Sequence, residues 1–226
     1  MTNQSDVLET ETVRSEAAYR AIKHEIVTAR IAPGTKLKVD ALQRQFGFSR
    51  SPLREALTRL AAEDFVVADQ RRGFRAARAS LGDLNDITHF RLVIEVHGLV
   101  DSIERGQKSW ETRIIDALDR LDAVESKLPR PERLHAEVWI ERHKDFHMAL
   151  ISACGSERLQ EQCSSLFDQS QRYRSLYALN RTGARNGSAE HRRILEAALA
   201  RDKATAAALM REHIAKTATH VAQYVE

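Results

Sequence analysis

The chain has 226 residues, of which 42% are hydrophobic and 30% charged, and its formal net charge is +3. These values are typical of a globular protein with one large domain or two small ones, and no apolar run approaches the roughly 18 residues that cross a bilayer. Two cysteines are too few for a disulfide framework. The polar, acidic N-terminus lacks the apolar segment of a signal peptide, so we expect a cytoplasmic protein without membrane association.

Positive charge is concentrated in the N-terminal part. Residues 1–80 contain 14 Lys and Arg against 10 Asp and Glu, whereas residues 81–226 contain 21 against 22. The excess lies in residues 44–78, with eight Arg and four acidic residues. This asymmetry predicts an anionic partner, such as nucleic acid, for the N-terminal part.

The first expected elements are a tail and two helices. Residues 1–11 are polar and acidic, which predicts a disordered tail. In residues 13–31 apolar side chains recur at helical spacing, and a Pro-Gly pair marks the turn that follows. Residues 36–48 predict a short extended piece and a short helix, after which Gly47 supplies a left-handed residue.

A third helix and a hairpin are expected next. Ser49 or Ser51 can cap this helix, whose buried stripe consists of Leu53, Ala56, Leu57 and Leu60. Residues 66–79 have β-forming residues on both sides of a polar turn that contains Gly73, which is typical of a hairpin. Three helices followed by a hairpin predict a winged helix-turn-helix.

Arginines occupy the positions of this predicted domain that face a nucleic acid. Arg50 and Arg54 lie four residues apart, opposite the buried stripe and near the N-terminal end of the third helix. An arginine there can pair with guanine in the major groove. The expected wing adds Arg71, Arg72 and Arg75. Gly73 among them lets the backbone approach a phosphate or the minor groove closely. The alternative is a set of solvated surface arginines.

Residues 37–74 resemble the DNA-binding domain of the GntR family of bacterial transcription regulators, and the run SRSPLREAL is the most specific element. The resemblance implies DNA contacts by Ser49, Arg50, Ser51, Arg54 and Gly73. Members of the family often have an arginine near the start of the second helix, where this chain has Asp40.

From about residue 81 onward the sequence has no strand signal. Six amphipathic segments follow, around residues 81–106, 109–128, 139–150, 156–179, 189–201 and 202–225. They predict an all-helical antiparallel bundle. The expected fold class is therefore mainly α, with a winged helix-turn-helix domain in residues 12–79 and a six-helix domain in residues 80–226.

Four histidines stand out in the helical part. His143 and His147 lie four apart on the apolar side of their helix, His191 lies on the inward face of another, and His213 lies beside the apolar stripe of the last. Four neutral imidazoles in an apolar interior each need a hydrogen-bond partner. One divalent metal would satisfy them together, since imidazole suits Zn, Ni, Co or Cu. Scattered core histidines are the alternative.

The histidine pattern, followed by ACGS, EHRRIL and ARDKATAAALMREHI, resembles the FCD ligand-binding domain of the FadR subfamily, and its six helices are closer to the VanR branch. Many members bind a metal through one Asp and three His. His147, His191 and His213 match the three histidines, whereas His143 stands where the aspartate usually is. The resemblance therefore implies a site of four imidazoles, with Zn or Ni as the expected metal.

The same resemblance implies a small carboxylic acid as the effector, bound at the metal. Arg91 falls where members have an arginine beside the pocket, and Arg174 lies on the same side of its helix as Ser170 and Tyr177. Either arginine could hold a carboxylate through two hydrogen bonds. Alternatively, Arg91 forms an ion pair with Glu95 on one helix face.

The leading hypothesis is a metabolite-responsive transcriptional regulator, expected to be a repressor and not an enzyme, whose homodimer binds palindromic double-stranded operator DNA. One alternative is a metal-dependent hydrolase or lyase with a basic appendage. Against it, the sequence has no HExxH motif and no Gly-rich phosphate loop. The other alternative is a metal sensor, whose DNA affinity would follow the free metal concentration.

Overall fold

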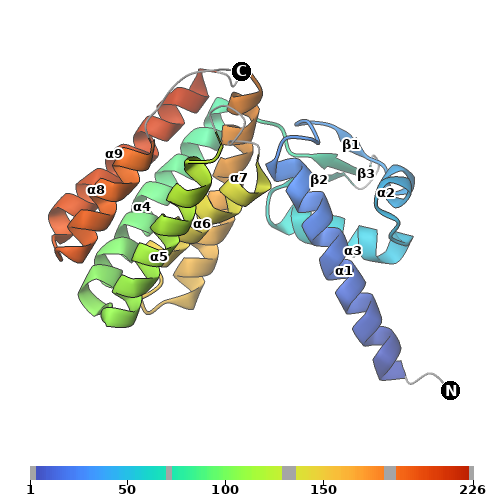
Figure 1. Cartoon of the computed structure of the whole chain (residues 1–226). Coiled ribbons are helices and arrows are strands. Elements are labelled where there is room, and N and C mark those ends of the chain that lie inside the picture. Colours follow the sequence, from blue (N-terminus) through green and yellow to red (C-terminus); the bar gives the residue numbers. More distant parts are fainter. Residues whose placement is uncertain (1–3, 70–72, 129–135, 181–186, 224–226) are drawn as a thin grey trace. The chain divides into compact units, whose positions relative to one another are not determined.

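The computed structural model describes residues 4–69, 73–128, 136–180 and 187–223 (Figure 1). The chain divides into two compact units, Met1–Ala79 and Ser80–Glu226. Helices dominate both units, which confirms the predicted mainly α fold class. Within the described ranges, no helix combines the length and the apolar character that a bilayer span requires.

The first unit has the winged helix-turn-helix arrangement that the sequence predicts, and we call it the winged unit. Its elements are α1 (Gln4–Val27), β1 (Lys36–Leu37), α2 (Val39–Phe46), α3 (Arg50–Ala62), β2 (Val66–Asp69) and β3 (Gly73–Ala76). In Figure 1, α1 lies against α3. The buried side chains of these two helices include Ala18, Ile22, Ile26, Leu53, Leu57 and Leu60. Their helical spacing places each set on one face, so the two faces form a common core.

Helix α1 begins earlier than the sequence predicts. The sequence favours a disordered tail through residue 11, whereas residues 4–11 belong to the helix. The segment contains no glycine or proline that would interrupt a helix.

Two local features fix the turn between α2 and α3. Gly47 has a φ of 75° and donates its backbone N–H to the Gln43 carbonyl at 2.9 Å, so it ends α2 in the left-handed conformation that the sequence predicts. Ser49 then occupies the N-cap position of α3, without a side-chain hydrogen bond to the helix. The sequence left Ser49 and Ser51 open as caps, and Ser51 lies inside α3.

The strands form a three-stranded antiparallel sheet in the order β1-β3-β2. The predicted hairpin is present and pairs β2 with β3 in the register Val66↔Ala76, but Gly73 begins β3 and does not lie in the turn. The two-residue strand β1 pairs with the free edge of β3, in the register Lys36↔Arg75. The sequence predicts an extended piece there, but its pairing joins residues far apart in the chain and gave no local signal.

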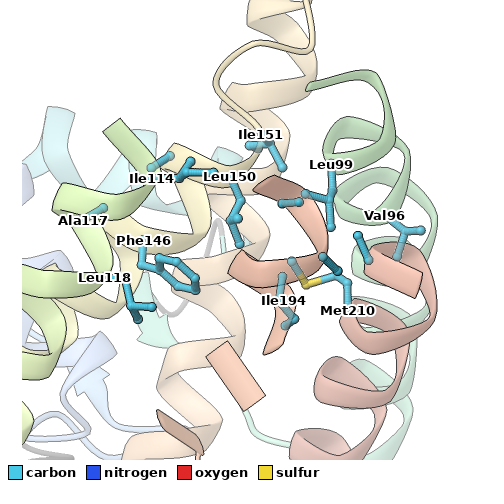
Figure 2. Close-up of a cluster of buried hydrophobic side chains, with 14 of the residues drawn as sticks. Val96, Leu99, Ile114, Ala117, Leu118, Phe146, Leu150, Ile151, Ile194 and Met210 are labelled. Atoms are coloured by element: carbon cyan, nitrogen blue, oxygen red, sulfur yellow. The ribbon is translucent and has the colours of Figure 1, made fainter. Parts of the chain in front are cut away.

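The second unit is a bundle of six helices among its described residues, as predicted, and we call it the helical unit. Its elements are α4 (Leu81–Arg105), α5 (Lys108–Glu125), α6 (Glu137–Leu150), α7 (Glu157–Asn180), α8 (Gly187–Leu199) and α9 (Lys203–Ala222). Helix α4 packs against α7 and α9, α5 packs against α6, and α8 packs against α9. The core draws side chains from across the bundle (Figure 2), including Leu99, Ile114, Phe146, Ile194 and Met210.

Helix α7 holds the first turn of α4 through polar contacts. Ser80 caps α4 by accepting the Asp83 backbone N–H at 3.2 Å. The Tyr173 hydroxyl accepts the Ser80 backbone N–H at 3.2 Å and donates to the Asp83 carboxylate, which also accepts from Arg172 Nη2 at 3.0 Å. Burial and the hydrogen bond with Asp83 raise the pKa of Tyr173 to about 12. The beginning of the helical unit is thereby fixed to α7.

The end of α4 yields a prediction about stability. At Gly106, a Cβ would lie 2.4 Å from the Trp110 ring and 2.6 Å from the Ser102 carbonyl oxygen. We expect Gly106→Ala to lower the free energy of unfolding by about 1–3 kcal/mol, because the backbone must shift to relieve the overlap. Urea denaturation measures this loss. Gly82→Ala is the control, since its Cβ would meet only Ser80 Oγ at 3.9 Å, and a loss equal to that of Gly106→Ala would contradict the steric explanation.

Candidate functional site

The winged unit contains a hollow of about 570 Å³ between the sheet, the start of α2 and α3. Four cationic residues line it: Lys36, Lys38, Arg50 and Arg54. Gly73, the first residue of β3, also lines it with a φ of 81°. This left-handed conformation favours glycine, and the missing side chain keeps the backbone accessible from the hollow.

The predicted contact residues on α3 lie on its exposed side. Ser49, Arg50, Ser51 and Arg54 are exposed, whereas Leu53 and the other stripe residues are fully buried. On β3, Arg75 is exposed and its Nη1 donates to the Gly34 carbonyl at 3.3 Å. Arg71 and Arg72, also predicted as contacts, lie outside the described residues.

Arg50 forms an ion pair that the sequence analysis missed. Its Nη2 lies 2.9 Å from Oδ1 of Asp40, in the first turn of α2. The spacing of Asp40 and Arg50 in the sequence is not that of helix neighbours. The contact exists because the tight turn after Gly47 folds the start of α3 back towards the start of α2.

The helical unit brings its four predicted histidines together. His143 and His147 come from α6, His191 from α8 and His213 from α9, and all four are 2–6% exposed. Each offers one nitrogen atom to a group whose members all lie within 4.8 Å of one another. The i, i+4 spacing on α6 places two rings on one face, and the packing of α8 on α9 supplies the other two.

Carboxylates contact the outer edge of this cluster. His213 Nδ1 lies 2.7 Å from Glu190 Oε2, and His147 Nδ1 lies 3.7 Å from Glu95 Oε2. The contact at His213 is a hydrogen bond of the kind that orients a metal-binding imidazole and selects its tautomer, whereas the distance at His147 is too long for a hydrogen bond. In the described part of the chain, both ring nitrogens of His147 and His143 Nδ1 are buried without a hydrogen-bond partner.

Burial sets the protonation of the cluster. It lowers the pKa of His143 well below the usual range, and it lowers the pKa of His147 to about 3 although Glu95 opposes this shift. Burial alone would raise the pKa of Glu95, but the charge of Arg91 and the contact with His147 lower it to about 2. At pH 7 the two imidazoles are therefore neutral, which is the form that coordinates a metal.

The donor set fits a divalent metal of borderline softness, such as Zn, Ni, Co or Cu. In a tetrahedral site, bonds of about 2.1 Å between zinc and imidazole nitrogen place the nitrogens roughly 3.4 Å apart. The observed limit of 4.8 Å is larger, so the rings would move closer together to bind one ion. His143 Nδ1 and one ring nitrogen of His147, which have no hydrogen-bond partner, could then each bind the metal.

A small cavity of about 60 Å³ adjoins the cluster and is lined by three of the histidines together with Arg174, Tyr177 and Thr217. Arg174 Nε donates to Gln171 Oε1 at 2.7 Å, and its Nη1 donates to Ser170 Oγ at 3.2 Å. These contacts hold a guanidinium at the cavity wall. The charge of Arg174 also contributes to the low pKa of His143, after burial and His147.

Arg91, the other arginine predicted to bind an effector, is engaged elsewhere. Its Nε and Nη2 donate to the two carboxylate oxygens of Glu95 at 2.5 and 3.0 Å, and its Nη1 donates to Ser170 Oγ at 2.9 Å. Arg91 is not among the residues that line the cavity. The ion pair left open as the alternative is therefore the arrangement present, because a buried guanidinium and a buried carboxylate each require a partner.

Comparisons with known proteins match both units. Residues 14–75 match the model of bacterial regulatory proteins of the gntR family, and residues 86–216 match the FCD domain model. The chain is 34% identical over 209 residues to the HTH-type transcriptional regulator BphR of Paraburkholderia xenovorans, covering 92% of this chain and 85% of BphR. It is 33% identical to the HTH-type transcriptional repressor GlaR of Escherichia coli, covering 90% and 93% of the two chains.

Among solved structures, Escherichia coli McbR/YncC matches with a TM-score of 0.78 and 19% identity, covering 93% of this chain and 97% of that one. A structure from Rhodococcus sp. RHA1, described as a transcriptional regulator GntR, has a TM-score of 0.75 and 20% identity, covering 95% and 100%. At these identities the likeness concerns the fold.

The contact between Glu190 and His213 yields a prediction about metal affinity. We expect Glu190→Gln to weaken zinc binding by about tenfold, because a neutral amide orients the His213 ring less firmly and makes it less basic. Competition with a chromophoric chelator measures the dissociation constant. Glu212→Gln is the matched control, since Glu212 precedes His213 directly but pairs with Lys216 at an exposed position. Equal effects of the two variants would argue against an orienting role for Glu190.

Proposed function

The chain belongs to the GntR family of bacterial regulatory proteins with an FCD domain, and we propose that a small carboxylic acid bound at the histidine cluster controls its affinity for operator DNA. It is a transcriptional regulator and not an enzyme. Regulators of this family bind operator DNA and are typically dimeric. Because the related GlaR is named a repressor, we propose repression for this chain as well.

In this proposal, α3 reads the operator in the major groove. Arg50 and Arg54 contact base edges, while Ser49 and Ser51 contact the phosphate backbone at the start of the helix. The wing, with Gly73 and Arg75, binds the neighbouring backbone, and the proposal includes Arg71 and Arg72. Support comes from the exposure of the described residues and from the cationic lining of the hollow. In a dimer, two such units meet the two halves of a palindrome.

The metal ligands in this proposal are His143, His147, His191 and His213. A bound divalent metal supplies positive charge and open coordination positions for oxygen ligands. Glu190 orients the His213 ring from outside, and the Glu95 carboxylate lies 3.7 Å from His147 Nδ1. The observation that carries the proposal is the convergence of four buried imidazoles from three helices beside a cavity with an arginine in its wall.

The cavity defines the class of effector. Arg174 offers a guanidinium for a carboxylate, and Tyr177 and Thr217 offer hydroxyl groups for further oxygen atoms. The small volume of about 60 Å³ favours a short acid over a bulky one. A regulator that responds to metal alone would need no such arginine, so these features favour an organic acid over a direct metal sensor.

Effector binding would reach the DNA-binding domain through the helices that hold the site. Helices α6, α7 and α9 all pack against α4, and the first turn of α4 follows the winged unit directly in the chain. A shift of α4 would change the spacing of the two recognition helices in a dimer. The effector moves this equilibrium only by its different affinity for the two arrangements, commonly about 1–3 kcal/mol.

The proposed role of Arg54 is tested by Arg54→Ala. We expect specific operator binding to weaken by about 1–3 kcal/mol and the preference at one base pair to relax. Arg75→Ala should instead weaken binding to all sequences alike and reduce its salt dependence. Binding to selected and random duplexes at several salt concentrations separates the two effects.

The control is Arg120→Ala, which removes an exposed charge from the helical unit. Unchanged affinity and selectivity in Arg54→Ala would refute the recognition-helix assignment.

The histidine site is tested by the double variant His147→Ala, His213→Ala. We expect it to lose bound metal and the response to small carboxylic acids while keeping DNA binding by the winged unit. Elemental analysis after reloading with Zn or Ni measures metal content. Thermal unfolding with a panel of acids measures the response, since a ligand at about 100 times its dissociation constant adds about 2.7 kcal/mol.

His97→Ala, which removes an exposed imidazole from the helical unit, is the control for the double variant. If the wild-type protein contained no metal after reloading, the four histidines would have a structural role only. DNA binding that follows free metal and ignores every acid would favour the direct metal sensor.

A further inference from the structure

The ion pair between Asp40 and Arg50 lies on the surface that the proposed function assigns to DNA. Both side chains line the hollow in the winged unit, with Arg54 beside them. Their side chains are 63% and 70% exposed. An ion pair this exposed contributes little to the stability of the fold. A structural role alone therefore gives no strong reason for this contact.

We infer that Asp40 is a positioning residue for base recognition, which fixes the guanidinium of Arg50 so that it reads one base pair selectively. The inference rests on the proposed DNA contact of Arg50. The Asp40 carboxylate engages Nη2 at 2.9 Å. This contact restricts rotation of the arginine side chain and leaves other N–H donors of the guanidinium for a base edge. An arginine that is already oriented loses less conformational freedom on binding.

The negative charge of Asp40 also increases selectivity for the operator. The hollow also contains Lys36, Lys38 and Arg54, which attract any phosphate backbone regardless of sequence. A carboxylate among them repels phosphate and weakens this nonspecific attraction. At an operator, closure of the interface removes water, and the attraction between Asp40 and Arg50 rises as the local dielectric constant falls, which offsets the cost of desolvating the two charges. Asp40 therefore lowers nonspecific affinity more than specific affinity.

The experiment compares four full-length proteins: wild type, Asp40→Asn, Arg50→Ala and the double variant. Each selects binding sequences from the same pool of randomised duplexes, and affinities are then measured for the wild-type consensus and for a random duplex. For Asp40→Asn we expect discrimination at the base pair read by Arg50 to fall by about tenfold. Its affinity for the random duplex should rise by about threefold. In the Arg50→Ala background, Asp40→Asn should change no base preference.

Two further variants distinguish the orienting effect of Asp40 from the effect of its charge and from a folding defect. Asp69→Asn removes the same charge from the same hollow, so it should raise affinity for the random duplex without changing base preferences. Asp40→Glu keeps the charge but moves the carboxylate by one methylene group. It should therefore change the preference at the Arg50 base pair while affinity for the random duplex stays as in wild type. This variant provides the test if Asp40→Asn fails to fold.

The possible results distinguish the inference from the proposed function. If Arg50→Ala selects the wild-type sequence with wild-type affinity, the proposed DNA contact of Arg50 fails, and the inference fails with it. If Arg50→Ala loses a preference that Asp40→Asn and Asp40→Glu both retain, only the positioning role is overturned. A change in base preference caused by Asp40→Asn in the Arg50→Ala background would also overturn it, because Asp40 would then read a base itself.

Discussion

Four imidazole rings are withdrawn from water inside the helical unit, and the polar contacts around them follow from that constraint. A buried polar atom needs a partner, and each partner that is itself buried needs another. His147 faces Glu95, Glu95 binds Arg91, and Arg91 donates to Ser170, which also accepts from Arg174. This series of contacts crosses from α6 through α4 to α7 and ends at the cavity wall.

The series explains why Arg91 does not bind an effector in our proposal. Its guanidinium compensates the charge of Glu95, which is almost completely buried. Removing one member of such a pair would leave the other charged in an apolar interior, which is strongly destabilising. Arg174 differs because it lines the cavity and its Nε and Nη1 contact the neutral partners Gln171 and Ser170. In the proposal, the same residue type therefore has a structural role on α4 and a ligand-binding role on α7.

Much of the fold could be predicted from periodicity. Side chains at helical spacing identified the six helices of the bundle, and the stripe around Leu53 identified the buried face of α3. Gly47 identified the end of α2 because few other residues adopt its backbone conformation. The four histidines could be grouped because their helix faces and the family pattern agreed. Residues 4–11 were predicted as part of a disordered tail and not as helix, since short polar segments without apolar spacing resemble disordered tails.

Contacts between elements were the part that local patterns could not supply. Glu190 lies beside His191 in the sequence, yet it contacts His213 on another helix. Strand β1 has only two residues and is a strand only because it pairs with β3. The pair of Asp40 and Arg50 depends on the angle of the turn between α2 and α3. In each case the decisive information is the packing of one element on another, which spacing along the chain does not contain.

The order of residues on α7 gives the helical unit a mechanical property. Tyr173, which holds Ser80 and Asp83, is the immediate neighbour of Arg174, which lines the cavity. An α-helix is stiff over so short a distance. A displacement of the α7 backbone at one residue is therefore shared by the next. Ser80 directly follows the last residue of the winged unit. In the proposed function, a displacement of α7 at the cavity wall would therefore reach the hydrogen bonds at Ser80 and Asp83 directly.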